Sequence, residues 1–503
     1  MPNTKLHVVF VHGWSVTNTD TYGELPRRLA KEAEGRGFEL SVRDLWLGRY
    51  ISFHDEVRLE DVSRAMEAAV RRDLADLLEA GERFVVITHS TGGPVARDWW
   101  LRFYAEPRKA DRCPMSHLVM LAPANFGSAL AQLGKSRVSR LKSWFQDVEP
   151  GQGVLDWLEL GSPEAWELNH KWITGRFGDA AADNVFPFVL TGQTIDRAFY
   201  DNLNSYTGEL GSDGVVRVAA ANLQSTYLKL EQAPLPAGSK PKKQDAGSPL
   251  EIKGRVRHSE SAPLRVIAGA SHSGKKLGVM RSVDDAKDSK HGRELVRAIF
   301  DCVSVKTSSQ YSALDRRFAD ETAAVQAAEL VEIQDRLLRD RTFIHDRATQ
   351  VIFRVTDTEG HPVNDFDLVL TGANDDPNLL PAGFFRDRQR NSRSGNTLTY
   401  FFNHDVMTGC PAVMHKGKEV REAQPGIDEL GLRIMPRPDE GFVRYVPASI
   451  RASEKIFEAI LRANQTTMVE IVLQRVVSEG VFRLGRGTRE VDFKDTKPGG
   501  SIE

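Results

Sequence analysis

The sequence predicts an α/β fold with a mostly parallel sheet, followed by a second region built mainly from β-strands. Over the first 305 residues, short apolar runs alternate with amphipathic helical patterns. Such runs are typical of parallel strands buried on both faces. After residue 342, short strand-like runs are separated by clusters of Gly, Pro, Asn and Asp, which indicates an antiparallel β-sandwich.

The composition is that of a globular protein without a strong charge bias. The chain has 503 residues, of which 41% are hydrophobic and 27% charged, and its net charge is −2. This length allows two or three domains, and the charge balance gives no reason to expect a nucleic-acid partner. Cys113, Cys302 and Cys410 form neither a disulfide framework nor a metal-ligand spacing, which favours a reducing compartment.

No segment of the sequence has the pattern of a leader or a membrane span. The apolar run from Leu6 to Val11 is too short for the core of a signal peptide and leads into His12 and Gly13. No stretch reaches the roughly 18 apolar residues that a membrane helix needs. We therefore expect the protein to be cytoplasmic as synthesised, any membrane contact to be peripheral, and any export to use a route without a cleaved leader.

The elements of the parallel sheet follow one another in regular alternation. Buried strands are expected at 5–11, 38–46, 84–87, 117–122, 185–190 and 264–268. Amphipathic helices are expected at 22–34, 60–80 and 94–104, and a closing helix at 294–303. The clearest of these helices is 60–80, which Gly81 is placed to end.

Three further segments complete the expected domain organisation after this alternation. Residues 124–180 hold four tryptophans and read as helices, which form either a lid or a cap that closes the core. Residues 306–341 are expected to form a helical linker. Residues 342–484 form the expected β-sandwich, whose first hairpin resembles immunoglobulin-like or transthyretin-like modules. The last residues, 485–503, are expected to be a flexible tail.

The stretch from Phe84 to Pro94 carries the strongest chemical signal. It begins as an apolar run, reaches Ser90 between small residues, and continues into a helix. A serine on such a sharp turn needs small residues two positions away on either side, because bulky side chains would collide. Gly92 meets this need, whereas Thr88 is small but β-branched. The pattern predicts Ser90 as a nucleophile, and a serine in an ordinary turn is the alternative.

A serine hydroxyl is a weak nucleophile unless a histidine takes its proton and a carboxylate orients that histidine. Asp213 is the preferred acid because it lies in a Gly-flanked turn beyond the Trp-rich segment. Asp196 and Asp201 also follow the strand at 185–190 and compete with it.

The histidine is expected on the loop after the last strand. His272 lies there, whereas His258 precedes that strand and His291 opens the closing helix. The sequence therefore predicts His272 as the general base.

A negatively charged oxygen that forms during acyl transfer needs two donors already in place. The backbone N–H of Thr91, directly after the nucleophile, is the first candidate. The second is the N–H of Trp14, in the loop after the first strand, where Gly13 lets the backbone approach closely. His12 precedes the acid in the chain, so we expect it to make a structural hydrogen bond. This chemistry needs no metal and no cofactor, and none is expected.

Four segments together resemble the lipase branch of the α/β-hydrolases; they are 8–14, the turn around Ser90, 211–216 and 269–274. The resemblance is closest to bacterial lipases and phospholipase-like proteins related to the GPI-inositol deacylase group, although Thr88 departs from the pattern. It covers residues 1 to about 305. It implies an α/β-hydrolase fold with a helical lid insertion, and the chain order Ser, acid, His. Some relatives are antibacterial phospholipases delivered by contact-dependent secretion, so the resemblance includes the hypothesis of an antibacterial lipase effector.

The leading hypothesis is a serine ester hydrolase that cleaves carboxylic esters of lipids through an acyl-enzyme intermediate. Ser90 would attack the carbonyl, His272 would move the proton, and Asp213 would orient His272. Two alternatives stay open: a soluble carboxylesterase or thioesterase for small esters, and a non-catalytic hydrolase scaffold used for binding. The expected partners are a lipid or other ester substrate, and the C-terminal region is a candidate surface for a protein partner.

Overall fold

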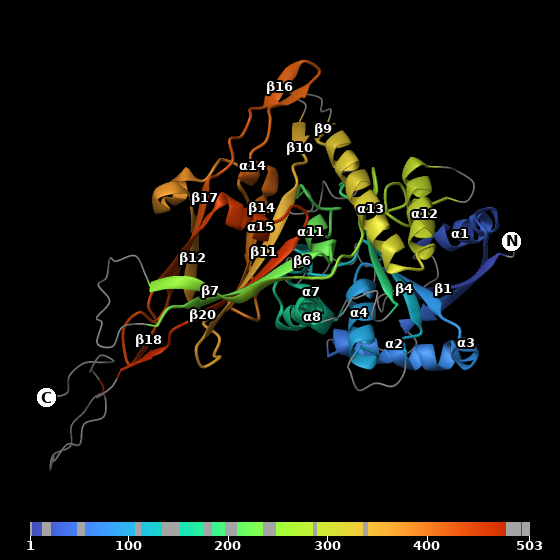
Figure 1. Ribbon diagram of the computed structural model, residues 1–503, viewed down its shortest axis with the longest axis horizontal. Helices are drawn as coiled ribbons and strands as arrows, with labels where there is room; N and C mark the ends of the chain where they lie inside the picture. Colours follow the sequence, from blue (N-terminus) through green and yellow to red (C-terminus); the bar gives the residue numbers. More distant parts are fainter. Residues whose placement is uncertain are drawn as a thin grey trace, which may run out of the picture.

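The structure of the protein is a computed structural model that describes residues 3–12, 22–47, 56–105, 112–132, 151–175, 184–196, 209–234, 248–284, 289–334, 341–478 and Lys494. In this part of the chain, two large sheets lie next to each other, and long helices pack against the first of them (Figure 1).

Six parallel strands form the first sheet, in the order β2-β1-β3-β4-β5-β8. They are β1 (Thr4–His12), β2 (Phe38–Trp46), β3 (Phe84–His89), β4 (Met115–Leu121), β5 (Phe186–Thr191) and β8 (Leu264–Val266). The central strands are buried almost throughout, which is why they appear in the sequence as continuous apolar runs. The mostly parallel sheet predicted from the sequence is confirmed.

Helices cover both faces of this sheet (Figure 1). The helices α2 (Leu59–Asp73) and α4 (Gly92–Phe103) pack into one apolar core. On the other face, α1 (Leu25–Ala33), α12 (Lys290–Val303) and α13 (Ser308–Ala328) enclose a second core. A short helix, α3 (Ala75–Glu79), follows α2. The loops that leave the carboxyl ends of β3, β5 and β8 therefore meet at one edge, where α/β sheets bind their ligands.

The described part of the Trp-rich segment is helical, as expected. It contains α7 (Gln152–Leu158) and α8 (Pro163–Thr174). Ser162 caps α8 by accepting a hydrogen bond from the N–H of Ala165 at 3.2 Å, and Pro163 occupies the first turn. The apolar side chains of both helices face the first core. Residues 133–150 and 176–180 of the predicted insertion lie outside the described residues.

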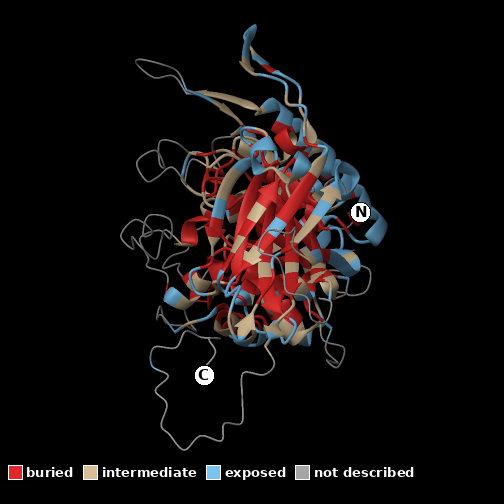
Figure 2. Cartoon of the chain, turned by 90° about the vertical axis from the view of Figure 1, so that its left-hand side faces the viewer, coloured by how far each residue is buried: buried red, intermediate tan, exposed pale blue. Residues whose placement is uncertain are grey.

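The second sheet has nine strands in the order β12-β17-β19-β7-β6-β20-β11-β14-β13. They are β6 (Ser225–Gln232), β7 (Ser248–His258), β11 (Ala348–Asp357), β12 (Phe366–Thr371), β13 (Phe385–Arg390), β14 (Thr397–Asn403), β17 (Glu429–Pro436), β19 (Ala448–Ser453) and β20 (Thr466–Leu473). Side chains from β12 at one end and from β14 next to the other end share one core, so the sheet curls around it. Figure 2 faces this sheet and shows its buried central strands.

Most neighbouring strands of the second sheet are antiparallel, as the sequence predicts for the C-terminal region. The pairs β11–β20, β6–β20 and β7–β19 are parallel. The sheet carries two short helices, α14 (His404–Thr408) and α15 (Glu454–Ile460). Two-stranded ribbons flank it: β9 (Val331–Gln334) with β10 (Arg341–Ile344), β15 (Val413–His415) with β16 (Lys418–Arg421), and β18 (Val443–Arg444) with β21 (Val476–Val477).

The expected boundary at residue 305 does not separate the two sheets. Strands β6 and β7 come from the first 305 residues, yet they lie in the middle of the second sheet, where β6 pairs with β20. Strand β7 was not predicted from the sequence: it is largely exposed and has no continuous apolar run, although Leu250, Ile252 and Val256 alternate with charged residues. The two halves of the chain are therefore interleaved.

The predicted helical linker over 306–341 is only partly helical. The helix α13 begins after Thr307, which forms a capping box with Gln310, and it ends at Ala328. The chain then forms the β9–β10 ribbon. Val331 and Ile333 alternate with polar residues there, which suits a strand. The predicted tail at 485–503 lies outside the described residues except for Lys494.

Candidate active site

The chain turns sharply where β3 meets α4, and Ser90 occupies the apex of that turn. Ser90 has a φ of 51°, a left-handed conformation that is strained for residues other than glycine. The turn leaves the serine just beyond the carboxyl end of β3. This is the backbone geometry of the nucleophile elbow described for α/β-hydrolases.

Close packing around this turn explains the residue types beside Ser90. A Cβ placed on Gly92 would lie 3.1 Å from the Cβ of Thr88, and a Cβ placed on Gly93 would lie 2.7 Å from the Cβ of Pro123. A side chain at position 92 would therefore crowd Thr88, which would have to shift by a few tenths of an ångström. Thr88 fits because position 92 is glycine.

Three predicted side chains meet at this edge of the sheet. His272 Nε2 lies 3.1 Å from Ser90 Oγ, and His272 Nδ1 lies 2.9 Å from Asp213 Oδ2. A carboxylate can only accept a hydrogen bond, so Nδ1 carries the hydrogen. In the neutral imidazole, Nε2 is then the acceptor for the Ser90 hydroxyl. This arrangement places a base between an acid and a hydroxyl group.

The acid is fixed by its own loop as well as by the imidazole. Asp213 is fully buried, and its Oδ1 accepts hydrogen bonds from the N–H groups of Val215 at 3.0 Å and Val216 at 2.8 Å. The N–H of His272 also donates to the backbone oxygen of Asp213 at 2.9 Å. These bonds leave Oδ2 facing the imidazole, so both the loop and the carboxylate are oriented towards His272.

The competing residues named from the sequence lie elsewhere or outside the described residues. Asp196 lies beyond β5, close to Gly274 of the histidine loop, and Asp201 is not among the described residues. His258 lies in β7 of the second sheet, and His291 lies in α12. The preferred acid and the preferred histidine are thus the pair that hydrogen bonds join.

His89 is a neighbour of the site that our sequence interpretation did not single out. Its ring centroid lies 4.8 Å from that of His272, and its Nε2 donates to the His272 backbone oxygen at 3.1 Å. Burial lowers the pKa of His89 to about 3, with a smaller effect from His272, so this ring is neutral. Its place directly before Ser90 was the one available signal.

The first expected oxyanion donor lies at a helix start. Thr91 is buried and is the N-cap of α4, where backbone N–H groups lack acceptors within the helix. Trp14, the second expected donor, lies outside the described residues. Strand β1, which precedes Trp14 in the chain, is held at its end by His12. The Nε2 atom of His12 pairs with Asp44 Oδ1 at 2.8 Å, and its ring stacks on that of Trp46 with centroids 4.2 Å apart. His12 thus makes the expected structural hydrogen bond.

A buried arginine ties helix α8 to the helix that follows the nucleophile. Arg97 of α4 donates to Asn125 Oδ1 at 3.2 Å and to Asn169 Oδ1 of α8 at 3.0 Å. Its guanidinium also lies over the Trp172 ring, 4.5 Å from the centroid. Burial lowers the pKa of Arg97 to about 9. These contacts favour a fixed cap over a moving lid for the described part of this segment.

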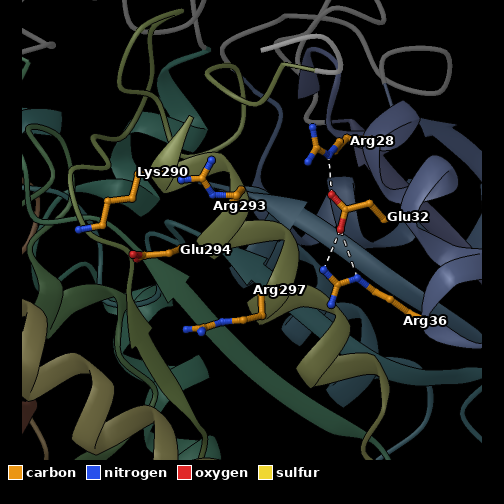
Figure 3. A pocket seen from close by; sticks show the side chains of 7 residues that line it. All are labelled: Arg28, Glu32, Arg36, Lys290, Arg293, Glu294 and Arg297. Atoms are coloured by element: carbon orange, nitrogen blue, oxygen red, sulfur yellow. Dashed lines mark hydrogen bonds and ion pairs between the residues drawn. The ribbon is translucent and has the colours of Figure 1, made fainter. Parts of the chain in front are cut away.

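A cavity of ≈ 450 Å³ lies between α1 and α12 (Figure 3), and Ser90, His272 and Asp213 are not among its lining residues. Its lining side chains are all charged: Arg28, Glu32, Arg36, Lys290, Arg293, Glu294 and Arg297. Glu32 pairs with Arg28 at 2.5 Å and with Arg36 at 2.7 Å, as the dashed lines show. A cavity with such walls does not suit an acyl chain.

Among the described residues, no group of three or more His, Cys, Asp or Glu side chains is arranged to hold a metal ion. No helix in the same part of the chain is long and apolar enough to cross a membrane.

Comparison with known proteins adds two closely similar structures. Phospholipase PlaB from Legionella pneumophila has a TM-score of 0.83 and 41% sequence identity, and the match covers 97% of this chain and 98% of that chain. The same phospholipase in complex with thio-NAD has a TM-score of 0.82 and 40% identity over 99% of this chain and 100% of that chain. No family profile and no curated protein sequence matches the chain.

Proposed function

The chain belongs to the family of phospholipase PlaB and is a lipase- or phospholipase-like ester hydrolase, and from this premise we propose that Ser90, His272 and Asp213 are its catalytic triad. The observation that carries the proposal is the chain of two hydrogen bonds, from Asp213 Oδ2 through the imidazole of His272 to Ser90 Oγ. The strained backbone of Ser90 supports it independently.

In the proposed mechanism, Ser90 Oγ attacks the ester carbonyl while His272 Nε2 takes the hydroxyl proton. Asp213 holds the ring in the tautomer that can accept this proton, and stabilises the imidazolium that forms. The N–H of Thr91, with that of Trp14 as the second donor, would stabilise the oxyanion. His272 then gives its proton to the departing alcohol, which leaves an acyl group on Ser90. A water molecule releases the fatty acid by the same steps.

We propose glycerophospholipids as the substrates, because the relative that matches along the whole chain is a phospholipase. The test is a panel of defined phospholipids, analysed for released fatty acid by mass spectrometry, with wild type and Ser90→Ala side by side. Release by the wild type alone supports the proposal. A short-chain series of soluble esters separates the alternative, since a soluble carboxylesterase or thioesterase would prefer butyryl over palmitoyl esters.

The complex of PlaB with thio-NAD supports a second proposal, that this chain binds a nicotinamide dinucleotide. Isothermal titration of the full-length protein with NAD is the direct test. Saturable binding would support it, and the absence of heat at millimolar NAD would contradict it. The same titration with adenosine monophosphate shows whether the nicotinamide half is needed.

We also propose that the protein is cytoplasmic as synthesised and meets lipid as a peripheral protein. Co-flotation of the Ser90→Ala variant with phospholipid vesicles, followed by a wash in 1 M salt or sodium carbonate, tests the membrane contact. A peripheral protein is released by the wash. Fractionation of the producing cells tests the compartment, and an intact N-terminus on any exported protein would support a route without a cleaved leader.

A further inference from the structure

The loop that carries Asp213 is closed at its base by an ion pair. The N–H of Val218 donates to the backbone oxygen of Gly211 at 2.9 Å, and Ser212 forms a β-bridge with Arg217. Arg217 then spans the base, because its Nε and Nη2 both donate to the Glu209 carboxylate at 2.8 Å. This two-pronged geometry is the strong form of an arginine–carboxylate pair.

The same guanidinium extends into the second sheet. Arg217 Nη1 donates to Gln350 Oε1 of β11 at 3.1 Å, and Nη2 also pairs with Asp387 of β13. The guanidinium lies over the ring of Phe401 in β14, 4.2 Å from its centroid. Arg217 is 2% exposed. One buried side chain therefore connects the acid loop to three strands of the C-terminal region.

Two further contacts hold the loop against this sheet. Arg386 Nη1 donates to the backbone oxygen of Leu210 at 2.9 Å. Gly211 has a φ of +84°, and a Cβ placed on it would lie 3.3 Å from Cζ of Phe401 and 3.4 Å from Cβ of Ala348. The backbone directly before Asp213 thus rests on the second sheet. The short helix α11 (Val218–Ala221), which continues the loop, lies at the junction of the two sheets (Figure 1).

Two carboxylates beside Arg217 keep its guanidinium ionised. Burial lowers the pKa of Arg217, but the carboxylates of Glu209 and Asp387 more than offset this effect, and the pKa is raised overall. A buried charge persists in a protein only when it is paired in this way. The guanidinium therefore stays charged and keeps its hydrogen bonds to Glu209, Gln350 and Asp387.

We propose that Arg217 is a positioning residue through which the C-terminal sheet holds Asp213 at hydrogen-bond distance from His272. This inference rests on the proposed function, because it takes Asp213 as the acid of the triad. Its consequence is that the second sheet takes part in catalysis without touching substrate. A shift of about 1 Å in a group that supports the reacting atoms can cost about a hundredfold in rate.

The test compares Arg217→Lys with Arg354→Lys in the full-length protein. Lysine keeps the charge but cannot bind Glu209, Gln350 and Asp387 with a planar fork. Arg354 is the matched control, because it also joins the second sheet to the first region, through Glu167 at 3.2 Å, but at helix α8. kcat and KM are measured with p-nitrophenyl butyrate, below the onset of thermal unfolding. We expect Arg217→Lys to lower kcat roughly 10- to 100-fold with KM within about twofold, and Arg354→Lys to leave both unchanged.

A second measurement separates positioning from a general loss of structure. In the Asp213→Asn background, Arg217→Lys is expected to lower kcat by less than about twofold, since two residues that act as a unit are not additive. The proposal is overturned if the two effects multiply, or if folded Arg217→Lys retains the wild-type kcat. If Arg217→Lys does not melt cooperatively, Asp387→Asn replaces it with the same criteria. Failure of the proposed function looks different, because Asp213→Asn alone would then keep wild-type activity.

Discussion

The hydroxyl of Ser90 lies 3.1 Å from Nε2 of His272, although 182 positions of sequence separate the two residues. Parallel strands make this contact possible, because their carboxyl ends lie at the same edge of the sheet. Ser90 follows β3 and His272 follows β8, two strands that lie on either side of β4 and β5. The same edge receives Asp213 from the segment after β5.

Replacing the proposed nucleophile is expected to abolish hydrolysis without unfolding the protein. Ser90→Ala removes the attacking oxygen, so kcat/KM should fall by at least about 10⁴-fold. The melting temperature should stay within a few degrees, because one partly exposed hydroxyl is lost. Ser309→Ala, at an exposed position in α13, is the control and should keep wild-type activity. Hydrolysis by Ser90→Ala at more than one hundredth of the wild-type rate would argue against this serine.

Two aspartates that compete in the sequence should behave differently when neutralised. Asp213→Asn replaces the carboxylate that accepts from His272 Nδ1, and the wrong tautomer should lower kcat by about 10⁴-fold. Asp196→Asn should change kcat less than about threefold, since Asp213 is the residue that pairs with the imidazole. Steady-state kinetics of the two variants measure both effects. A larger loss of kcat in Asp196→Asn than in Asp213→Asn would identify Asp196 as the acid.

The tight contact around the nucleophile predicts an energetic coupling between positions 88 and 92. A Cβ on Gly92 would lie 3.1 Å from Cβ of Thr88, so Gly92→Ala should destabilise the wild-type protein by about 1 kcal/mol or more. In the Thr88→Gly background this contact is gone, and the added methyl group should cost less. Urea unfolding of the four proteins measures the coupling, which we expect at about 0.5–2 kcal/mol. A coupling near zero would mean that the turn relaxes freely.

A buried histidine far from the chemistry should make stability sensitive to acid. His117 Nε2 donates to the backbone oxygen of Val305 at 2.8 Å, and burial lowers the pKa of His117 to about 4 from 6.5. Between these values the unfolded chain takes up a proton that the folded state excludes. Stability is therefore lost as the pH falls from 6.5 to 4.

The variant His117→Gln keeps a donor for Val305 but cannot titrate. In the wild type, His117 adds up to one proton to the difference in proton binding between the unfolded and folded states. Without it, the slope of the unfolding free energy against pH in this window should fall by up to about 1.4 kcal/mol per pH unit. Urea titrations at half-unit pH steps measure this slope. An unchanged slope would show that His117 is not the residue responsible.

The parallel sheet and the meeting of Ser90, His272 and Asp213 at one edge of it could be predicted because both leave local signals. Buried parallel strands are continuous apolar runs, and the site residues follow their ends in a fixed order along the chain. Asp213 could be preferred to Asp196 for its Gly-flanked turn, although both follow β5, and the structure adds its hydrogen bond to His272. The geometry of Ser90 was implied by its small neighbours, whereas the tolerance for Thr88 became clear only from the packing at Gly92.

The connection between the two halves of the chain could not be predicted. Strand β7 is exposed over most of its length, and its short alternation of Leu250, Ile252 and Val256 with charged residues does not show which sheet it joins. Arg217 meets Asp387 across 170 positions, and no local pattern marks such a pair. His89 was also missed, because a histidine at a strand end has no characteristic pattern of its own. These features depend on tertiary contacts between segments that are distant in sequence.

The most direct test of Ser90 as the nucleophile is mass spectrometry of the intact protein and of its tryptic peptides after reaction with an alkyl p-nitrophenyl phosphonate. We expect one adduct on the wild-type protein, carried by the tryptic peptide 84–97, and no adduct on Ser90→Ala. Wild-type protein that hydrolyses esters but stays unlabelled, or a Ser90→Ala variant labelled as fully as the wild type, would contradict it.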